Sequence, residues 1–96
     1  MKLKDLVESL ELVEVRGGLD KEIRGVTYDS RKALPGYLFV CIDGFTTDGH
    51  KYAQQAVDNG ACTLVVEKDI HVIGEDVTII RVKNSREALA LISANW

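Results

Sequence analysis

The chain has 96 residues, which is the size of one small domain. Its 15 acidic and 12 basic residues give a formal net charge of −3, which argues against a protein that binds nucleic acid through bulk positive charge. Hydrophobic residues make up 46% of the chain, yet no apolar run approaches the ~20 residues of a membrane helix, so neither a disordered chain nor a membrane protein is expected. Two cysteines are too few for a disulfide framework, which favours a reduced, cytoplasmic protein.

The first half of the chain predicts one helix followed by short strands. Apolar residues recur at helical spacing over 2–10, and two β-prone segments follow at 13–16 and 23–28. Pro35-Gly36 predicts a turn. The almost wholly apolar segment 37–42 then predicts a strand that is buried on both faces.

The middle of the chain predicts a loop and a helix. Segment 43–48 is polar and contains Gly44, which indicates a loop. A helix is expected over 50–59, with Asp48 as its N-cap and Gly60 as the left-handed residue that ends it.

Two more buried strands and a last helix complete the pattern. The strands are expected at 62–66 and 77–82, and Asn84-Ser85-Arg86-Glu87 fits a capping box. The inner face of the last helix is expected to contain Ala88, Leu89, Ile92 and Trp96. Apolar strands beside amphipathic helices predict an α/β fold, a single small domain with a mixed or mostly parallel sheet flanked by helices. Because the helical pattern continues to the last residue, we expect the chain to be a piece of a longer protein.

The strand, glycine-containing loop and helix over 37–59 form the strongest chemical pattern. A helix start offers unpaired N–H groups and a partial positive charge, which suits phosphate. Gly44 and Gly49 have the spacing of a nucleotide P-loop, but His50 and Lys51 replace the lysine and hydroxyl residue that such a loop needs. We therefore expect no ATP site here. An anion site at this helix start and a plain strand–helix turn both remain open, and the carboxylate of Asp48 counts against the anion site unless a basic side chain such as Arg31 or His50 faces the ligand.

Asp29-Ser30-Arg31 lies between two predicted strands. Ser30 can donate a hydroxyl hydrogen bond, and Arg31 offers a planar fork for phosphate or carboxylate. The alternative is an Asx turn held by Asp29 beside a solvated arginine. His50 and His71 lack acidic or cysteine partners at ligand spacing, so we expect a solvated or helix-start histidine rather than a metal ligand. Without a catalytic constellation, the chain is expected to bind rather than to catalyse.

Several of these segments resemble one family. The segments are Val26-Thr27-Tyr28-Asp29-Ser30-Arg31, Leu34-Pro35-Gly36, Asp48-Gly49-His50 and Gly60-Ala61. Together they resemble the N-terminal domain of the Mur ligases, cytoplasmic ATP-dependent enzymes that add amino acids to the UDP-linked peptidoglycan precursor. The closing stretch 82–90 is most similar to the UDP-N-acetylmuramoyl-tripeptide synthetases, the MurE type.

The resemblance implies that residues 1–96 bind the UDP end of UDP-MurNAc-L-Ala-D-Glu. It places the substrate contacts at Tyr28, Ser30, Phe45, Thr46 and Thr47. Tyr28 and Phe45 stand where other forms have an aliphatic residue and a histidine, and an aromatic ring can stack on the base. The residues expected to support these contacts are Asp29, Arg31, Gly44, Asp48, Gly49 and His50.

The resemblance also implies that the ATP-binding and C-terminal domains, with their Mg²⁺ sites, lie outside this chain. The full-length enzyme would add diaminopimelate or lysine, while the fragment itself needs no cofactor and is catalytically inactive. Expected partners are the precursor and the missing domains, with no nucleic acid or membrane. Two alternatives remain: the sister MurF type, which adds D-Ala-D-Ala, and a non-enzymatic interaction module of the same fold.

Overall fold

A five-stranded sheet forms the centre of the computed structural model, which describes residues 1–44 and 46–96. The order across the sheet is β1-β5-β4-β3-β2. β1 runs antiparallel to β5 and every other neighbouring pair is parallel, which confirms the predicted mixed, mostly parallel α/β sheet. The strands are β1 Leu12–Arg16, β2 Gly25–Thr27, β3 Tyr37–Val40, β4 Thr63–Val66 and β5 Thr78–Val82.

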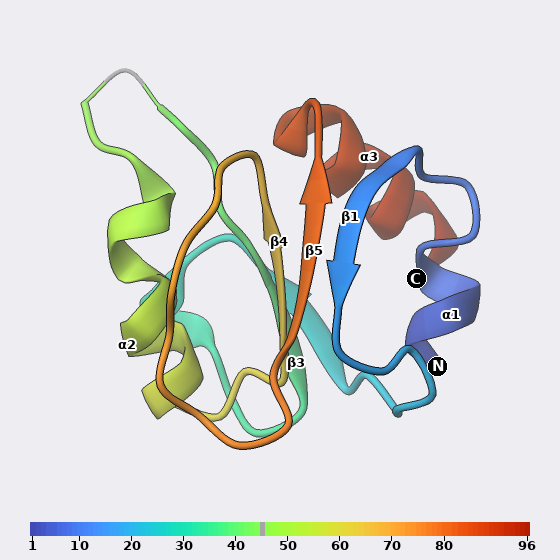
Figure 1. Cartoon of the computed structure of the whole chain (residues 1–96), viewed down its shortest axis with the longest axis horizontal. Coiled ribbons are helices and arrows are strands. Elements are labelled where there is room, and N and C mark those ends of the chain that lie inside the picture. The colour runs from blue at the N-terminus through green and yellow to red at the C-terminus, as the bar shows by residue number, and fades with distance from the viewer. Residues whose placement is uncertain (45) are drawn as a thin grey trace.

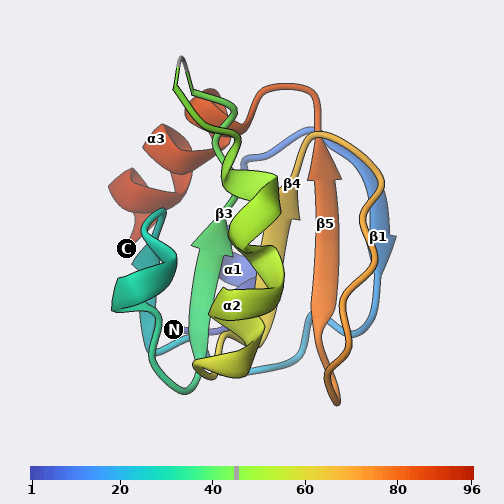
Figure 2. The same ribbon diagram turned by 90° about the vertical axis from the view of Figure 1, so that its left-hand side faces the viewer.

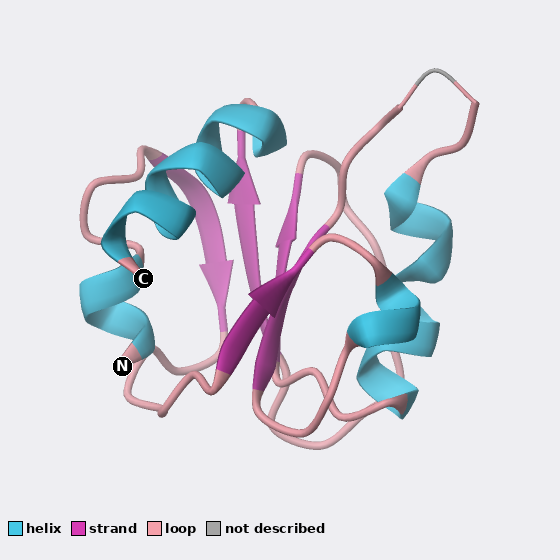
Figure 3. Cartoon of the chain, turned by 180° about the vertical axis from the view of Figure 1, so that it is seen from behind, coloured by secondary structure: helices cyan, strands magenta, loops and turns pink. Residues whose placement is uncertain are grey.

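Helices cover both faces of this sheet. α2 (Ala53–Asp58) covers one face, and α1 (Leu3–Leu6) and α3 (Ser85–Asn95) lie on the other (Figures 1 and 3). Two short 3-10 helices, η1 (Ser30–Lys32) and η2 (Gly49–Tyr52), follow β2 and β3. Among the described residues, no helix has the length and apolar character needed to cross a bilayer.

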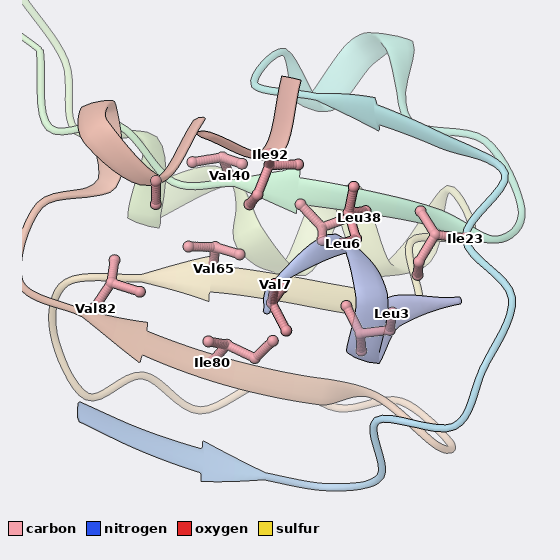
Figure 4. Packing of buried hydrophobic residues seen from close by; sticks show 11 residues of the cluster. Leu3, Leu6, Val7, Ile23, Leu38, Val40, Val65, Ile80, Val82 and Ile92 are labelled. Atoms are coloured by element: carbon pink, nitrogen blue, oxygen red, sulfur yellow. The ribbon is translucent and has the colours of Figure 1, made fainter. Parts of the chain in front are cut away.

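The sheet separates two apolar cores, which explains why its central strands β3 and β4 are mostly apolar. All four residues of β4 are buried, with Val65 in the core under α1 and α3 and its neighbours Leu64 and Val66 in the core under α2. Figure 4 shows side chains of the first core, including Val65 beside Leu6 of α1 and Ile92 of α3. The predicted burial of β3 and β4 on both faces is confirmed.

Three predicted elements differ from the structure. The helix expected at 2–10 is limited to α1, because residues 7–10 turn towards β1. The helix expected at 50–59 begins as the 3-10 helix η2, with Asp48 as its N-cap, and becomes α-helical only at Ala53. Trp96 does not belong to the inner face of α3, because 53% of it is exposed.

The end of α2 follows the prediction. Gly60 has a φ of +115°, and its N–H donates to the Val57 carbonyl at 2.9 Å. A Cβ atom on Gly60 would lie 2.6 Å from Pro35, so both the backbone angle and the available space require glycine. The chain then turns directly into β4.

The four parallel strands end at the same edge of the sheet (Figure 2). Segments far apart in the sequence therefore meet there: Tyr28 and η1 after β2, residues 41–44 and 46–48 after β3, Glu67 after β4 and Asn84 after β5. In open α/β sheets this is the edge at which ligands bind.

Candidate functional site

A hollow of about 500 Å³ opens at the carboxyl ends of β2 and β3. It unites three stretches of chain: the end of β2 with η1, the bend after β3, and the first turns of η2 and α2. Its lining residues are Tyr28, Asp29, Ser30, Arg31, Phe39, Ile42, Gly44, Thr46, Thr47, Gly49, Tyr52 and Gln55. The hollow thus gathers Tyr28, Ser30, Thr46 and Thr47 from the predicted contacts, whereas Phe45 lies outside the described residues.

Ser30 is held on two sides by α2. Its hydroxyl donates to Gln55 Oε1 at 2.9 Å, and its carbonyl accepts from Asn59 Nδ2 at 3.0 Å. Gln55 and Asn59 are one turn apart in the sequence of this helix, so a single face of it fixes η1. Ser30 is only 6% exposed although it lines the hollow.

Asp29 and Arg31 form a closed pair at the start of η1. Asp29 Oδ1 accepts from the Arg31 backbone N–H and from Nε, each at 3.0 Å, and Oδ2 accepts from Nη2 at 2.9 Å. Hydrogen bonds from the Arg31 side chain, followed by that from its backbone, hold the pKa of Asp29 below its ordinary value. The Asx turn considered as the alternative is therefore present, and two nitrogens of the guanidinium group are bonded to Asp29.

Asp48 and His50 anchor the bend after β3. Asp48 Oδ1 accepts from the His50 backbone N–H at 3.0 Å and from Nδ1 at 2.6 Å, while Lys68 bonds to its other oxygen. His50 Nε2 accepts from the Glu67 backbone N–H at 3.0 Å. His50 stands at a helix start as expected, but it is not solvated, because only 5% of its side chain is exposed.

Burial alone would raise the pKa of Asp48, but the hydrogen bonds from Lys68 and from the His50 backbone and ring outweigh it and hold this pKa well below its ordinary value. The network continues through Glu67, whose Oε2 accepts from the backbone N–H and the hydroxyl of Ser85. The Ser85 hydroxyl is the main reason that the pKa of Glu67 is also lowered. These bonds connect the loops after β3, β4 and β5.

The backbone amides at the start of η2 already have acceptors within the protein. Gly49 donates to the Ile42 carbonyl at 2.7 Å, His50 to the Asp48 side chain, and Lys51 to the Asp48 carbonyl at 3.1 Å. These three amides are therefore already bonded within the protein, which favours the plain strand–helix turn over an anion site at this helix start. A Cβ atom on Gly49 would lie 2.7 Å from the Ile42 nitrogen, so this glycine permits a tight turn rather than the approach of a ligand.

The segment with P-loop spacing lacks the lysine and the hydroxyl that bind ATP and its metal ion in such loops. Residues 1–44 and 46–96 contain no group of three His, Cys, Asp or Glu side chains able to hold a metal. The P-loop-like segment has Lys51 in place of the magnesium-binding hydroxyl, and its His50 is buried against Asp48. Cys41 is buried, and this burial, with Asp48 nearby, raises the pKa of its thiol to about 12, which agrees with an inert core thiol.

Four residues at this edge were not anticipated from the sequence. Tyr52 and Gln55 line the hollow, and Glu67 and Lys68 complete the network around Asp48. A usable signal existed for Glu67 and Lys68, since they directly follow a predicted parallel strand and so belong at the carboxyl edge. No comparable signal connects Gln55 with Ser30, which is 25 positions away.

Two curated proteins illustrate the similarity of this chain to known sequences. Both are named UDP-N-acetylmuramoyl-L-alanyl-D-glutamate--2,6-diaminopimelate ligase. The protein of Clostridioides difficile (strain 630) is 43% identical over 100% of this chain, and that of Clostridium botulinum (strain ATCC 19397 / Type A) is 49% identical over 100% of it. The chain covers 19% and 20% of those proteins, so it spans about one fifth of their length.

Solved structures share the fold. Crystal structure II of MurF from Acinetobacter baumannii superposes with a TM-score of 0.80 at 24% identity, over 98% of this chain and 20% of that chain. MurF ligase from Thermotoga maritima in complex with ADP gives 0.62 at 28% identity, over 73% of this chain and 16% of that chain. The sequence model described as "Mur ligase family, catalytic domain" matches residues 22–96. The chain therefore belongs to the Mur ligase family.

Proposed function

We propose that residues 1–96 are the substrate-binding part of a ligase that joins 2,6-diaminopimelate to UDP-N-acetylmuramoyl-L-alanyl-D-glutamate during peptidoglycan synthesis. The observation that carries this proposal is the 43% and 49% identity, over the whole chain, to two proteins with that name. The MurF structures share the fold of this chain, but they are 24% and 28% identical to it, which is less than the identity to the two diaminopimelate ligases. The D-Ala-D-Ala-adding alternative therefore has less support. The same identity favours a ligase over a non-enzymatic module.

The hollow beside Ser30 is the part of the chain best suited to the UDP end of this substrate. Its volume of about 500 Å³ is within the ~300–1,000 Å³ range of small-molecule sites. Tyr28 and Tyr52 are 65% and 42% exposed and offer aromatic surface for a base, while Ser30, Thr46 and Thr47 add hydroxyl groups. This mixture of aromatic and polar groups supports nucleotide binding.

The domain's contribution to the reaction would be positioning. Binding of the distant UDP end restricts the positions that the D-Glu carboxylate can occupy. This restriction lowers the entropic part of the activation barrier at the reacting atoms. ATP and Mg²⁺ would bind to parts of the protein outside these residues. The chain alone is then catalytically inactive, and the family resemblance implies a cytoplasmic location.

The test is a titration of the ¹⁵N-labelled chain with UDP, followed by amide chemical shifts. We expect shifts at Ser30, Thr47 and Gly49, and a roughly three- to tenfold weaker affinity for Ser30→Ala, which removes one hydrogen-bonding group. Ser93→Ala, at an exposed position of α3, is the matched control and should bind like the wild type. Unchanged spectra at millimolar UDP, with well-dispersed signals of a folded chain, would contradict the proposal.

A further inference from the structure

The hydroxyl of Ser30 has a defined direction. A serine hydroxyl carries one proton and two lone pairs, so it can donate one hydrogen bond and accept two. Its proton points to Gln55 Oε1, 2.9 Å away. The group that remains available to a ligand in the hollow is therefore an acceptor.

This direction restricts the part of a nucleotide that can contact Ser30. Phosphate oxygens at neutral pH are acceptors and would have to displace Gln55 to bond to the Ser30 hydroxyl. A uracil N3–H or a ribose hydroxyl is a donor and meets the free lone pairs directly. The bond to Gln55 thus favours the nucleoside over the diphosphate at this position.

The charges around Ser30 lead to the same conclusion. Asp29 and Arg31, the two charged side chains among the described lining residues, are bonded to each other through both carboxylate oxygens. The first amides of η2 donate to Ile42 and Asp48. Part of the donor capacity near Ser30 is therefore already used within the protein, while Tyr28 and Tyr52 present aromatic surface.

We infer that Gln55 is a positioning residue that fixes the Ser30 hydroxyl as a hydrogen-bond acceptor, so that Ser30 selects an N–H or O–H donor of the ligand's nucleoside. The inference rests on the proposed function, since it assigns part of the same hollow. It concerns selectivity between ligands, which a merely structural role of Gln55 would not alter.

The experiment compares the affinity of the chain for UDP with that for three analogues, N3-methyl-UDP, 2′-deoxy-UDP and 3′-deoxy-UDP. Each analogue lacks one donor of the nucleoside. The variants are Gln55→Glu, which keeps an acceptor for Ser30, and Gln55→Met, which removes it. Gln54→Met is the matched control, because Gln54 lies on the same helix but bonds to the backbone of Ile73 instead.

We expect one analogue to bind the wild type roughly three- to tenfold more weakly than UDP. The same ratio should persist in Gln55→Glu and Gln54→Met and should approach one in Gln55→Met and Ser30→Ala. The carboxylate added in Gln55→Glu repels UDP and its analogues alike. The ratio of the two affinities within one variant therefore cancels this repulsion.

The outcomes separate this inference from the proposed function. If UDP binds but no analogue is discriminated, the inference is overturned and the proposed function stands. If the discrimination persists in Gln55→Met, Ser30 accepts from the ligand without Gln55, and if it disappears in Gln55→Glu, an acceptor at position 55 is not what fixes the hydroxyl; both results overturn the inference. If UDP does not bind at all, the proposed function fails and the inference fails with it.

Discussion

Asp48 joins three parts of the chain through one carboxylate. It bonds to the His50 backbone and ring and to Lys68, which lies two residues after the end of β4. Removal of the charge in Asp48→Asn weakens these bonds and should lower the free energy of unfolding by about 1–3 kcal/mol. Urea unfolding measures this. Asp20→Asn, which changes an exposed aspartate paired with Lys2, should unfold at the wild-type urea concentration.

The same carboxylate predicts a dependence of stability on pH. The pKa of Asp48 is lower in the folded chain than the ordinary value of about 3.9, so the unfolded chain binds the proton more readily. The stabilisation is complete above this ordinary value and is lost as the pH falls through it towards the folded pKa. Urea midpoints between about pH 6 and pH 3 should fall less steeply for Asp48→Asn than for the wild type. Equal slopes would contradict this role.

Single residues were only partly predictable from the sequence. Asp48 was expected as an N-cap and Asp29 as the holder of a turn, because their acceptors serve amides two residues away. The burial of His50 was not expected, because its partner Glu67 is 17 positions away and is brought to it by the sheet. Hydrogen bonds between residues close in the sequence can be predicted from residue spacing. Hydrogen bonds between distant segments can be predicted only when the order of the strands in the sheet is known.

At the scale of elements, Gly60 decides where α2 ends. Its φ of +115° and the 2.6 Å distance that would separate an added Cβ atom from Pro35 are both unfavourable for alanine. Gly60→Ala should therefore lower the free energy of unfolding by about 1–3 kcal/mol. Gly18→Ala is the control, since a Cβ atom there would meet nothing within 4 Å. Equal thermal midpoints for the two variants would show that the turn tolerates a side chain.

Element boundaries followed the sequence where a cap or turn residue marked them. Asn84 accepts from the Glu87 N–H at 3.0 Å and begins α3 as predicted. The helix expected over 2–10 was too long, because its apolar spacing continues into a turn in which Leu10 still packs against the core. Periodicity reports which residues face the core, and it does not distinguish a helix from a turn that serves the same face.

The whole molecule depends on one sheet shared by two cores. Leu64 packs into the core under α2 and Ile80 into the core under α1 and α3, and both are fully buried. Leu64→Ala and Ile80→Ala should each cost about 2–5 kcal/mol. Because both cores use the same strands, each variant should still unfold in a single transition with the wild-type urea slope. Two separate transitions in circular dichroism would show independent cores.

The sequence predicted the fold class but not the strand order. β1 and β2 follow each other in the chain, yet they form opposite edges of the sheet. β1 pairs instead with β5, with Leu12 opposite Val82, and nothing in either segment specifies so distant a partner. The parallel arrangement of β3, β4 and β5 was implied by their largely apolar character, whereas the pairing of β2 with β3, which brings η1 and the bend after β3 together, was not.

The central claim is that the nucleoside of UDP lies in the hollow between η1 and η2. Intermolecular nuclear Overhauser effects between the uridine protons and the side chains of the chain test it most directly. The account predicts contacts from the uridine protons to Tyr28, Tyr52 or Gln55. Contacts confined to the smaller hollow around Leu10 and Leu91, at the start of α3, would contradict it.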